Sequence, residues 1–223
     1  MKLIDLGPLG YRDAWKRQED AHAEVVAGAE EQLLLVEHPP VITFGRRAEI
    51  AGQKNLITPR EMLSMLGVEI IQSDRGGDVT FHGPGQIVAY PIVRLNDHGL
   101  SVGGFVRRLE ETVIATLKSF HIPAQKDDCA IGVWAPNPDG ALAKICALGV
   151  RIRRGVSLHG IALNVTIDLT YFKLIIPCGL TGRAVTSMKQ LLGHATPPID
   201  LVKARLAERM LEAFGGRAAT RST

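Results

Sequence analysis

The chain has 223 residues, of which 46% are hydrophobic and 22% are charged, a balance typical of a globular protein. A formal net charge of +3 without a long basic block argues against a nucleic-acid-binding protein. No apolar run is long enough to span a bilayer, and the early Asp5 argues against a signal peptide. Three cysteines in a chain without a secretory signal indicate reduced thiols and a cytoplasmic location.

Helix and strand patterns alternate along the chain, which predicts an α/β or α+β fold. Apolar runs between turn residues predict strands at residues 2–6, 33–37, 41–44, 68–72, 79–81, 87–93, 130–135, 143–152 and 159–167. Amphipathic periodicity predicts helices at residues 11–27, 59–66, 101–120 and 200–214. We expect a single domain over residues 1–216 and a disordered tail over residues 217–223.

Two of the predicted helices have distinctive sequences. Thr58-Pro59-Arg60-Glu61 reads as a capping box with proline at the first helical position. The longest helix carries apolar residues every three or four positions, a stripe that we expect to face a core. The stripe consists of Val102, Phe105, Val106, Leu109, Val113, Leu117 and Phe120.

The stretch from Arg75 to Gln86 is rich in glycine and lies between two predicted strands. It reads Arg75-Gly76-Gly77-Asp78-Val79-Thr80-Phe81-His82-Gly83-Pro84-Gly85-Gln86. A plain double turn would need fewer glycines, since one residue with positive φ closes a hairpin. Because ionisable and polar side chains are interleaved with the glycines, we interpret the stretch as a ligand-binding wall.

Lys144 lies inside an otherwise apolar strand. Strict alternation would place it on one face with Cys146, Leu148 and Val150. A lysine at such a position either reaches water at the end of the strand or is desolvated beside a partner. On this residue alone, the first reading is the more frequent one.

Cys178 follows the apolar run Ile175-Ile176-Pro177 and precedes Gly179. Most cysteines after apolar runs are inert core thiols, but one held between a proline and a glycine at a bend suits an exposed nucleophile. A cation such as Lys144 would lower the pKa of this thiol, or a neutral amine would take its proton. Of the other cysteines, Cys129 is a poor thiolate because Asp127-Asp128 precede it, and Cys146 reads as strand packing.

Two basic clusters, Arg46-Arg47 and Arg151-Ile152-Arg153-Arg154, stand out from the rest of the chain. Each is either a solvated strand end or a surface for an acidic protein or a phosphate. The sequence leaves both readings open.

Four blocks together resemble the octanoyl-(acyl-carrier-protein):protein octanoyltransferases of lipoate synthesis. They are Arg75 to Gln86, Lys144 to Arg151, His159-Gly160-Ile161-Ala162-Leu163-Asn164-Val165 and Pro177-Cys178-Gly179, in the order that the family has them. The resemblance extends from about Leu33 to Leu192. It implies the fold of the lipoate- and biotin-protein ligases, a mixed β-sheet flanked by helices, with the acyl chain in a tunnel.

The resemblance also implies a reaction and its residues. Cys178 would take an octanoyl group from octanoyl-acyl carrier protein as a thioester, with Lys144 as its partner, and pass it to a lysine of a lipoyl domain of 2-oxoacid dehydrogenases or of the glycine-cleavage H protein. No cofactor, metal, nucleic acid or membrane would take part. The implied substrate-binding residues are Arg75, Gly76, Gly77, Asp78, Val79, Thr80, Phe81, His82, Ala147, Leu148, Gly149, Gly160, Ile161 and Ala162.

Some roles stay open after this comparison. His82 would orient Lys144 or the acyl carbonyl, or make a structural hydrogen bond to its own loop. An ATP-dependent lipoate- or biotin-protein ligase, an octanoyl amidotransferase and a non-catalytic acyl-chain binder are the alternative functions. We expect a monomer, and the sequence sets neither the acyl chain length nor the preferred acceptor.

Overall fold

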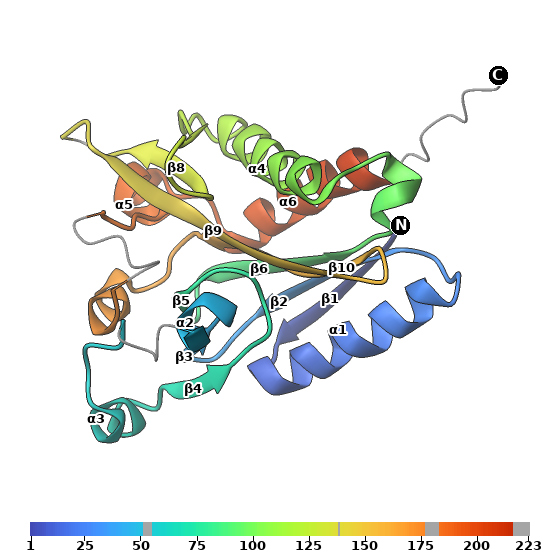
Figure 1. Ribbon diagram of the computed structural model, residues 1–223. Helices are drawn as coiled ribbons and strands as arrows, with labels where there is room; N and C mark the ends of the chain where they lie inside the picture. The colour runs from blue at the N-terminus through green and yellow to red at the C-terminus, as the bar shows by residue number, and fades with distance from the viewer. Residues whose placement is uncertain (51–54, 138, 177–182, 216–223) are drawn as a thin grey trace.

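A computed structural model describes residues 1–50, 55–137, 139–176 and 183–215 of the chain. Its described part contains two β-sheets with helices packed around them (Figure 1). Cys178 and the tail 217–223 lie outside the described residues. The expected disorder of that tail therefore stays a prediction.

The larger sheet has seven strands in the order β1-β2-β6-β10-β9-β8-β7 within the described residues. β1 runs parallel to β2, and every other neighbouring pair is antiparallel, so the sheet is mixed. In that spatial order the strands are Lys2–Pro8, Gln32–Glu37, Gln86–Ile92, Val156–Asn164, Leu142–Arg153, Val133–Pro136 and Gln125–Lys126.

The smaller sheet has three strands in the order β4-β3-β5. These are Glu69–Gln72, Val41–Phe44 and Val79–His82, with β3 parallel to β4 and antiparallel to β5. The glycine-rich stretch thus contains a strand of this small sheet, as predicted, and its end leads directly into β6 of the large sheet.

Helices cover both faces of the large sheet. Helix α1 (Tyr11–Val26) lies on one face, and α4 (Val102–Lys118) and α6 (Ile199–Phe214) lie on the other, as Figure 1 shows. The shorter helical segments are α2 (Arg46–Ile50), α3 (Arg60–Met65), α5 (Met188–Leu192), η1 (Leu95–His98), η2 (Leu169–Leu174) and η4 (Gly193–Ala195). The predicted class, a mixed sheet flanked by helices, is confirmed.

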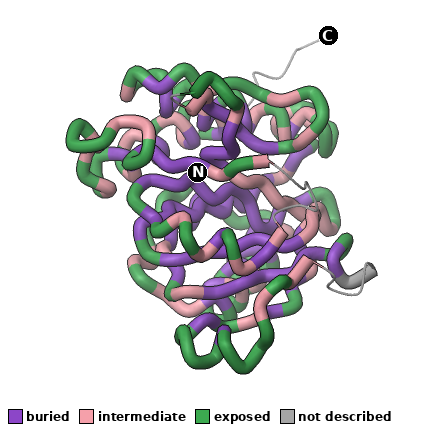
Figure 2. The backbone as a smooth tube through the Cα atoms, turned by 90° about the vertical axis from the view of Figure 1, so that its left-hand side faces the viewer, coloured by how far each residue is buried: buried purple, intermediate pink, exposed green. Residues whose placement is uncertain are grey.

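The two faces of the large sheet carry separate apolar cores. On the α4 side, Leu33, Ile87 and Ile161 pack against α4 and α6. On the α1 side, Val88 and Ala162 pack against α1. Figure 2 shows the buried segments gathered inside the molecule, with exposed segments around them. Because side chains alternate along a strand, a residue's position decides on which face of the sheet, and in which of the two cores, its side chain lies.

The predicted stripe of α4 faces the core for most of its length. Phe105, Leu109, Val113 and Leu117 have no exposed surface, and the Ser101 side chain caps the helix by accepting a hydrogen bond from the Gly104 N–H. Val102, however, is 52% exposed, so the prediction that it faces the core is wrong.

The predicted capping box of α3 is also wrong. The helix begins at Arg60, and Pro59 is its N-cap with φ −55° and ψ 144°, an extended conformation outside the helix. Among the described residues, no side chain makes a capping hydrogen bond to α3. The proline ends the preceding extended segment instead of starting the first turn.

Strands β9 and β10 form the long hairpin that the sequence predicts. Its turn is Arg154-Gly155, with φ of 52° and 75°, the conformation that two-residue hairpin turns require. Two arginines of the basic cluster have partners within the chain: Arg151 pairs with Asp74, and Arg153 with Glu19. Much of this cluster's charge is thus compensated internally.

None of the helices in the described ranges is long and apolar enough to cross a lipid bilayer. The same ranges contain no group of three or more His, Cys, Asp or Glu side chains placed to hold a metal ion.

Candidate active site

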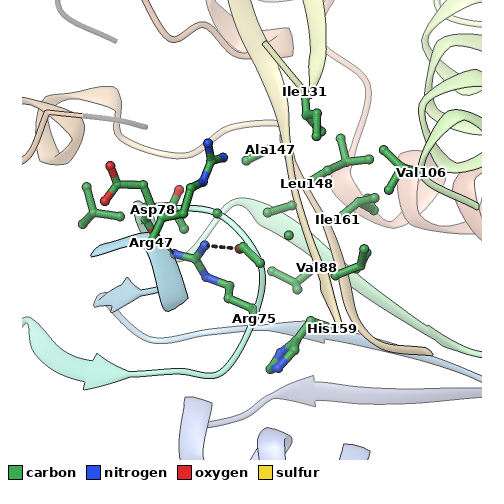
Figure 3. Close-up of a pocket in the computed structure, with 18 of the residues that line it drawn as sticks. Arg47, Arg75, Asp78, Val88, Val106, Ile131, Ala147, Leu148, His159 and Ile161 are labelled. Carbon is green, nitrogen blue, oxygen red and sulfur yellow. Dashed lines mark hydrogen bonds between the residues drawn. The ribbon is translucent and has the colours of Figure 1, made fainter. Parts of the chain in front are cut away.

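A cavity of about 430 Å³ lies where the glycine-rich loop meets β9 and β10. Strand β8 pairs with β9 only as far as Cys146, so the part of β9 beyond that residue has an edge that β8 leaves uncovered. The cavity borders this edge and has lining residues on both faces of the large sheet. Figure 3 shows Arg47, Arg75 and Asp78 on one side of the two strands and Val106 on the other.

A β-bulge in β9 decides where Lys144 points. The adjacent β8 residues Val133 and Trp134 pair with Cys146 and Lys144 of β9. Ile145 lies between these two partners and has no partner of its own in β8, so it is the extra residue of the bulge. Ile145 and Cys146 both lie in the core on the α4 side. The prediction that Lys144 shares a face with Cys146, Leu148 and Val150 is therefore wrong, because the extra residue turns Lys144 to the face of Ala147 and Gly149.

Lys144 is 7% exposed and lines the cavity. Its Nζ donates a hydrogen bond to the Ile131 carbonyl at 3.0 Å and lies 4.8 Å from the centroid of the Trp134 ring. The amine is thus held by a carbonyl dipole and by an aromatic face. Of the two readings of this residue, the structure supports the desolvated lysine with partners.

The backbone of Lys144 is joined to the chain segment that follows Cys178. The Lys144 N–H donates to the Ala184 carbonyl at 2.9 Å, and the Thr186 N–H donates to the Lys144 carbonyl at 2.9 Å. Upstream of the cysteine, the Ile176 N–H donates to the Asn55 carbonyl at 2.8 Å. Both chain ends that lead to residues 177–182 are thus fixed, one of them directly beside Lys144.

The glycine-rich loop covers the edge of β9. The Gly76 N–H donates to the Val150 carbonyl at 3.0 Å. A Cβ added to Gly149 would lie 2.8 Å from the Gly76 carbonyl oxygen, and one added to Gly76 would lie 2.8 Å from the Val150 carbonyl oxygen. Glycine at these positions lets the two backbones touch, which is the physical reason for part of the motif.

Arg75 holds the loop together from inside. It is 7% exposed, and its guanidinium donates to the carbonyls of Thr43, Gly76 and Asp78 at 2.7 to 3.0 Å. A charged group that is desolvated in this way needs such acceptors. Arg75 thus lines the cavity and stabilises the curved loop by donating hydrogen bonds to carbonyl groups of the loop backbone.

Small residues of β9 and β10 form the cavity wall on the α1 side. Ala147 pairs with Ala162, and Gly149 pairs with Gly160. Leu148 and Ile161 also line the cavity but pack toward the core on the α4 side. All six residues of β9 and β10 that the resemblance implies for substrate binding therefore line the cavity, and so do seven of the eight from the glycine-rich stretch. The exception is Phe81, whose side chain stacks on Tyr171 in another core.

Three aromatic side chains stand at the end of the cavity away from Lys144: Tyr11, Tyr90 and His159. His159 has φ of 59°, in the left-handed region, and donates through Nε2–H to the Asp74 carboxylate at 2.6 Å. Nδ1 of the same ring is buried and has no hydrogen-bond partner among the described residues. Burial lowers the pKa of His159, although Asp74 opposes this.

His82 does not contact Lys144 through any described hydrogen bond. Its Nδ1 bonds the Gln86 Oε1 at 2.7 Å and its Nε2 lies 3.4 Å from the Thr43 hydroxyl, so it has the structural role that the sequence left open. Burial lowers the pKa of His82 well below its usual value, and His38 and Arg75 add to this. Both histidines are buried neutral rings at neutral pH.

Two of the three cysteines lie within the described residues. Cys146 is fully buried, and burial strongly raises the pKa of its thiol, as expected for a packing residue. Cys129 is exposed and lines the cavity mouth with Ile131 and Lys144. The predicted nucleophile, Cys178, lies outside the described residues, so its pairing with Lys144 stays a prediction.

With this geometry in view, residues 10–211 match the family described as the lipoyl protein ligase A/B catalytic domain. The chain belongs to this family. It is 45% identical over 213 residues to an octanoyltransferase of Roseiflexus sp. (strain RS-1), covering 95% of this chain and 84% of that one. It is 47% identical over 211 residues to an octanoyltransferase of Chloroflexus aurantiacus, covering 94% and 92%. These relatives confirm that the chain is an acyltransferase enzyme.

Solved structures with the same fold include a lipoate-protein ligase A bound with ATP, with a TM-score of 0.78 and 18% identity, covering 95% of this chain and 84% of that chain. The biotin protein ligase of Aquifex aeolicus superposes with a TM-score of 0.53 and 12% identity, over 96% and 68% of the two chains. At such identities the likeness concerns the fold alone, and it confirms the lipoate/biotin-protein ligase-like architecture.

Several cavity residues were missing from the sequence-based set. They are Tyr11, Arg47, Val88, Tyr90, Val102, Val106, Cys129, Ala130, Ile131, Val150 and His159. His159 opens the motif that supplied Gly160 to Ala162, so the sequence offered a signal for it. The others read as core or surface positions, because only the folded sheet brings them to one space.

Proposed function

We propose that this enzyme transfers an octanoyl group from octanoyl-acyl carrier protein to the ε-amine of a lysine on a lipoyl domain or on the glycine-cleavage H protein. The acyl group passes through a thioester on Cys178. This is the transfer that supplies octanoylated proteins for lipoate formation. The relatives named octanoyltransferases support the acyl group, and the position of Lys144 supports the chemistry.

Two balanced steps make up the reaction. The Cys178 sulfur attacks the carbonyl of the donor thioester, a new carbon–sulfur bond forms, and the carrier's thiol leaves with a proton. The acceptor amine then attacks the Cys178 thioester, an amide forms, and the Cys178 thiol is released. The first step exchanges one thioester for another and the second ends in a more stable amide, so neither requires ATP.

Lys144 has two tasks in this scheme. As a cation it stabilises the Cys178 thiolate, and as a base it receives the proton of the attacking amine. Lys144 is 7% exposed and lines the cavity, so its amine lies within reach of a substrate bound there. The small side chains of Ala147 and Ala162, which line the cavity, leave space for an apolar chain on the same face as this amine.

The single observation that carries the proposal is the backbone pairing of Lys144 with Ala184 and Thr186. Ala184 comes six residues after Cys178 in the sequence, and six extended residues span at most about 20 Å. The pairing thus restricts how far the cysteine can lie from the lysine. Arg183, the first described residue after position 182, is held by an ion pair with Asp127.

The test is intact-mass analysis of a Cys129→Ser background enzyme after incubation with octanoyl-acyl carrier protein. Cys129 is removed because it is exposed at the cavity mouth, whereas buried Cys146 serves as an internal control thiol. We expect one octanoyl adduct that hydroxylamine releases, that Cys178→Ser abolishes, and that a lipoyl domain discharges without ATP.

Lys144→Ala in the same background should keep the fold and slow alkylation of Cys178 near neutral pH, because the thiolate loses its cation. An unchanged pH profile for that alkylation would contradict the role of Lys144. Product formation that needs ATP and persists in Cys178→Ser would instead identify a ligase.

A further inference from the structure

We propose that Tyr90 and His159 close the far end of the acyl channel and set the length of the acyl chain that the enzyme accepts. This inference rests on the proposed function, since it concerns the substrate of the same cavity. It assigns a specificity role to two residues that no part of the reaction chemistry requires.

The channel begins at Lys144 because of the bulge at Ile145. Lys144 shares the α1 side of the large sheet with Ala147 and Gly149, and not with Leu148. An acyl group attached near the amine can therefore extend along this face without crossing the sheet.

Two rows of small residues follow along the strands. The first row is Ala147 and Ala162, with Val88 of β6 beside them, and the second is Gly149 and Gly160. The glycine-rich loop lies over the second row, where the Arg75 guanidinium comes within 3.4 Å of the position of a Gly149 Cβ. The loop thus occupies the space beside Gly149, and the first row, Ala147 and Ala162, is left for an unbranched methylene chain, whose burial stabilises the complex.

Two large side chains stand at the second row, Tyr90 beside it on β6 and His159 next to it along β10. Register places Tyr90 beside Gly160, since Ala89 pairs with Ile161. His159 would lie on the α4 side by alternation, but its positive φ brings its ring against Trp15 of α1, 5.9 Å between ring centroids. Both rings therefore stand in the path of the chain.

Neither ring is free to move aside. Tyr90 is 3% exposed, and its hydroxyl donates to Nε2 of His38 at 2.8 Å while the His38 Nδ1–H donates to the Leu9 carbonyl. His159 is 1% exposed and held by Asp74, and its buried Nδ1 offers an apolar chain no partner. A longer chain would have to overpack these rings and bury methylenes against a polar atom.

The dimensions agree with an eight-carbon chain. Leaving out the bulge residue, four strand steps of ~3.3 Å separate Lys144 from Gly149, or about 13 Å. Seven carbon–carbon bonds of ~1.5 Å reach at most about 10 Å from the thioester carbon. An octanoyl chain that starts near the lysine ammonium thus ends just before the second row, where two further carbons meet Tyr90 and His159.

A competing path exists on the α4 side, where Val102, Val106 and Leu148 line the cavity. Val102 is 52% exposed there, so a chain on this side would remain partly in water. On the α1 side, Lys144, Ala162 and Tyr90 are buried, so a chain there loses more of its contact with water, and this is the favoured path. Substitutions on the α1 side and on the α4 side of the sheet distinguish these two paths of the acyl chain.

The test measures kcat/KM for six-, eight-, ten- and twelve-carbon acyl-carrier-protein thioesters in the full chain. Tyr90→Ala should raise the ratio of ten- to eight-carbon transfer by about 15-fold, the factor expected for burying two further methylenes. Ala162→Val, which narrows the first row, should shift the preference toward six carbons. Val106→Ala tests the competing path on the α4 side, and Ile114→Val in α4, which does not line the cavity, is the control that should leave the profile unchanged.

Circular dichroism verifies that each variant is folded, and Ala162→Val carries the test if Tyr90→Ala does not fold. A profile that shifts in Val106→Ala but not in the α1-side variants overturns the inference while leaving the transfer reaction intact. A wild-type chain that transfers none of the four acyl groups contradicts the proposed function itself.

Discussion

The guanidinium carbon of Arg183 lies 4.3 Å from the centroid of the Trp134 ring. Nζ of Lys144 lies 4.8 Å from the same centroid, so one buried indole contacts both cations. Arg183 is further held by Asp127, to which its Nη1 donates at 2.9 Å. Trp134 therefore connects the proposed catalytic amine with the first described residue after the segment that contains Cys178.

Replacing Trp134 by leucine should slow acyl transfer about tenfold, because partly desolvated cation–π contacts are worth ~1–2 kcal/mol. Trp134→Phe keeps an aromatic face and should retain most activity, although it loses the indole N–H bond to the Ala130 carbonyl. Single-turnover rates with octanoyl-acyl carrier protein check this. Equal rates for the two variants would show that the ring contributes only packing.

Gly149→Ala should weaken the closure of the glycine-rich loop, because the new Cβ would lie 2.8 Å from the Gly76 carbonyl oxygen. We expect a loss of about 1–3 kcal/mol in unfolding free energy and a raised KM for the acyl donor. Gly103→Ala in α4 is the matched control, since its Cβ meets nothing closer than 3.5 Å and alanine favours a helix. Denaturant unfolding that finds both substitutions neutral would contradict the contact.

Asp74→Ala should destabilise the fold by about 2–3 kcal/mol, because it leaves the buried Nε2–H of His159 without its acceptor. It also removes the partner of Arg151 and thus two links between the glycine-rich loop and the β9-β10 hairpin. Asp74→Asn retains an oxygen acceptor for His159 and should cost less. Urea unfolding of both variants measures the difference, and equal losses would argue against the hydrogen bond.

Acidification should destabilise the protein well before its carboxylates titrate. Burial lowers the pKa of His38 from its usual value near 6.5 to about 4, and burial also lowers the pKa values of His82 and His159. A lowered folded-state pKa gives stability that is fully present above the unfolded pKa and is lost as the pH falls toward the folded one. His38 alone should account for about 2 kcal/mol between pH 7 and pH 5.

Thermal or urea unfolding across this pH window checks the histidine effect. His38→Gln removes the titrating ring and should flatten the pH dependence, even though its stability at neutral pH will be lower. A slope that is unchanged in His38→Gln would assign the acid sensitivity to other groups.

Local patterns predicted most of the architecture. The stripe Phe105, Leu109, Val113 and Leu117 and the glycine turns around β5 are short-range signals, and the structure confirms them. The capping box at Thr58 failed because Pro59 is compatible with both an extended residue and a first helical turn, and only the surrounding chain selects between them.

The site was harder to predict because it depends on register. Alternation from Lys144 gave the wrong face, since a bulge leaves no mark in a run of apolar residues such as Ile145-Cys146. Tyr90 carries no signal of a shared cavity, because it lies in an apolar strand that meets β10 only after the large sheet forms. His159 stands at the start of a recognised motif, but its positive φ, which turns its ring to the α1 side, cannot be read from the sequence.

Because Ile145 is an extra residue in β9, the direction in which the Lys144 side chain points depends on the presence of this single residue. Deleting it would restore uninterrupted alternation and swing Lys144 into the aliphatic layer beneath α4, where an ammonium has no place. Inserting or deleting one residue in this strand would thus move the side chains that precede or follow the change to the opposite face of the sheet. Length variation in this family should therefore be tolerated at the Arg154-Gly155 hairpin tip and purged between Lys144 and Ala147.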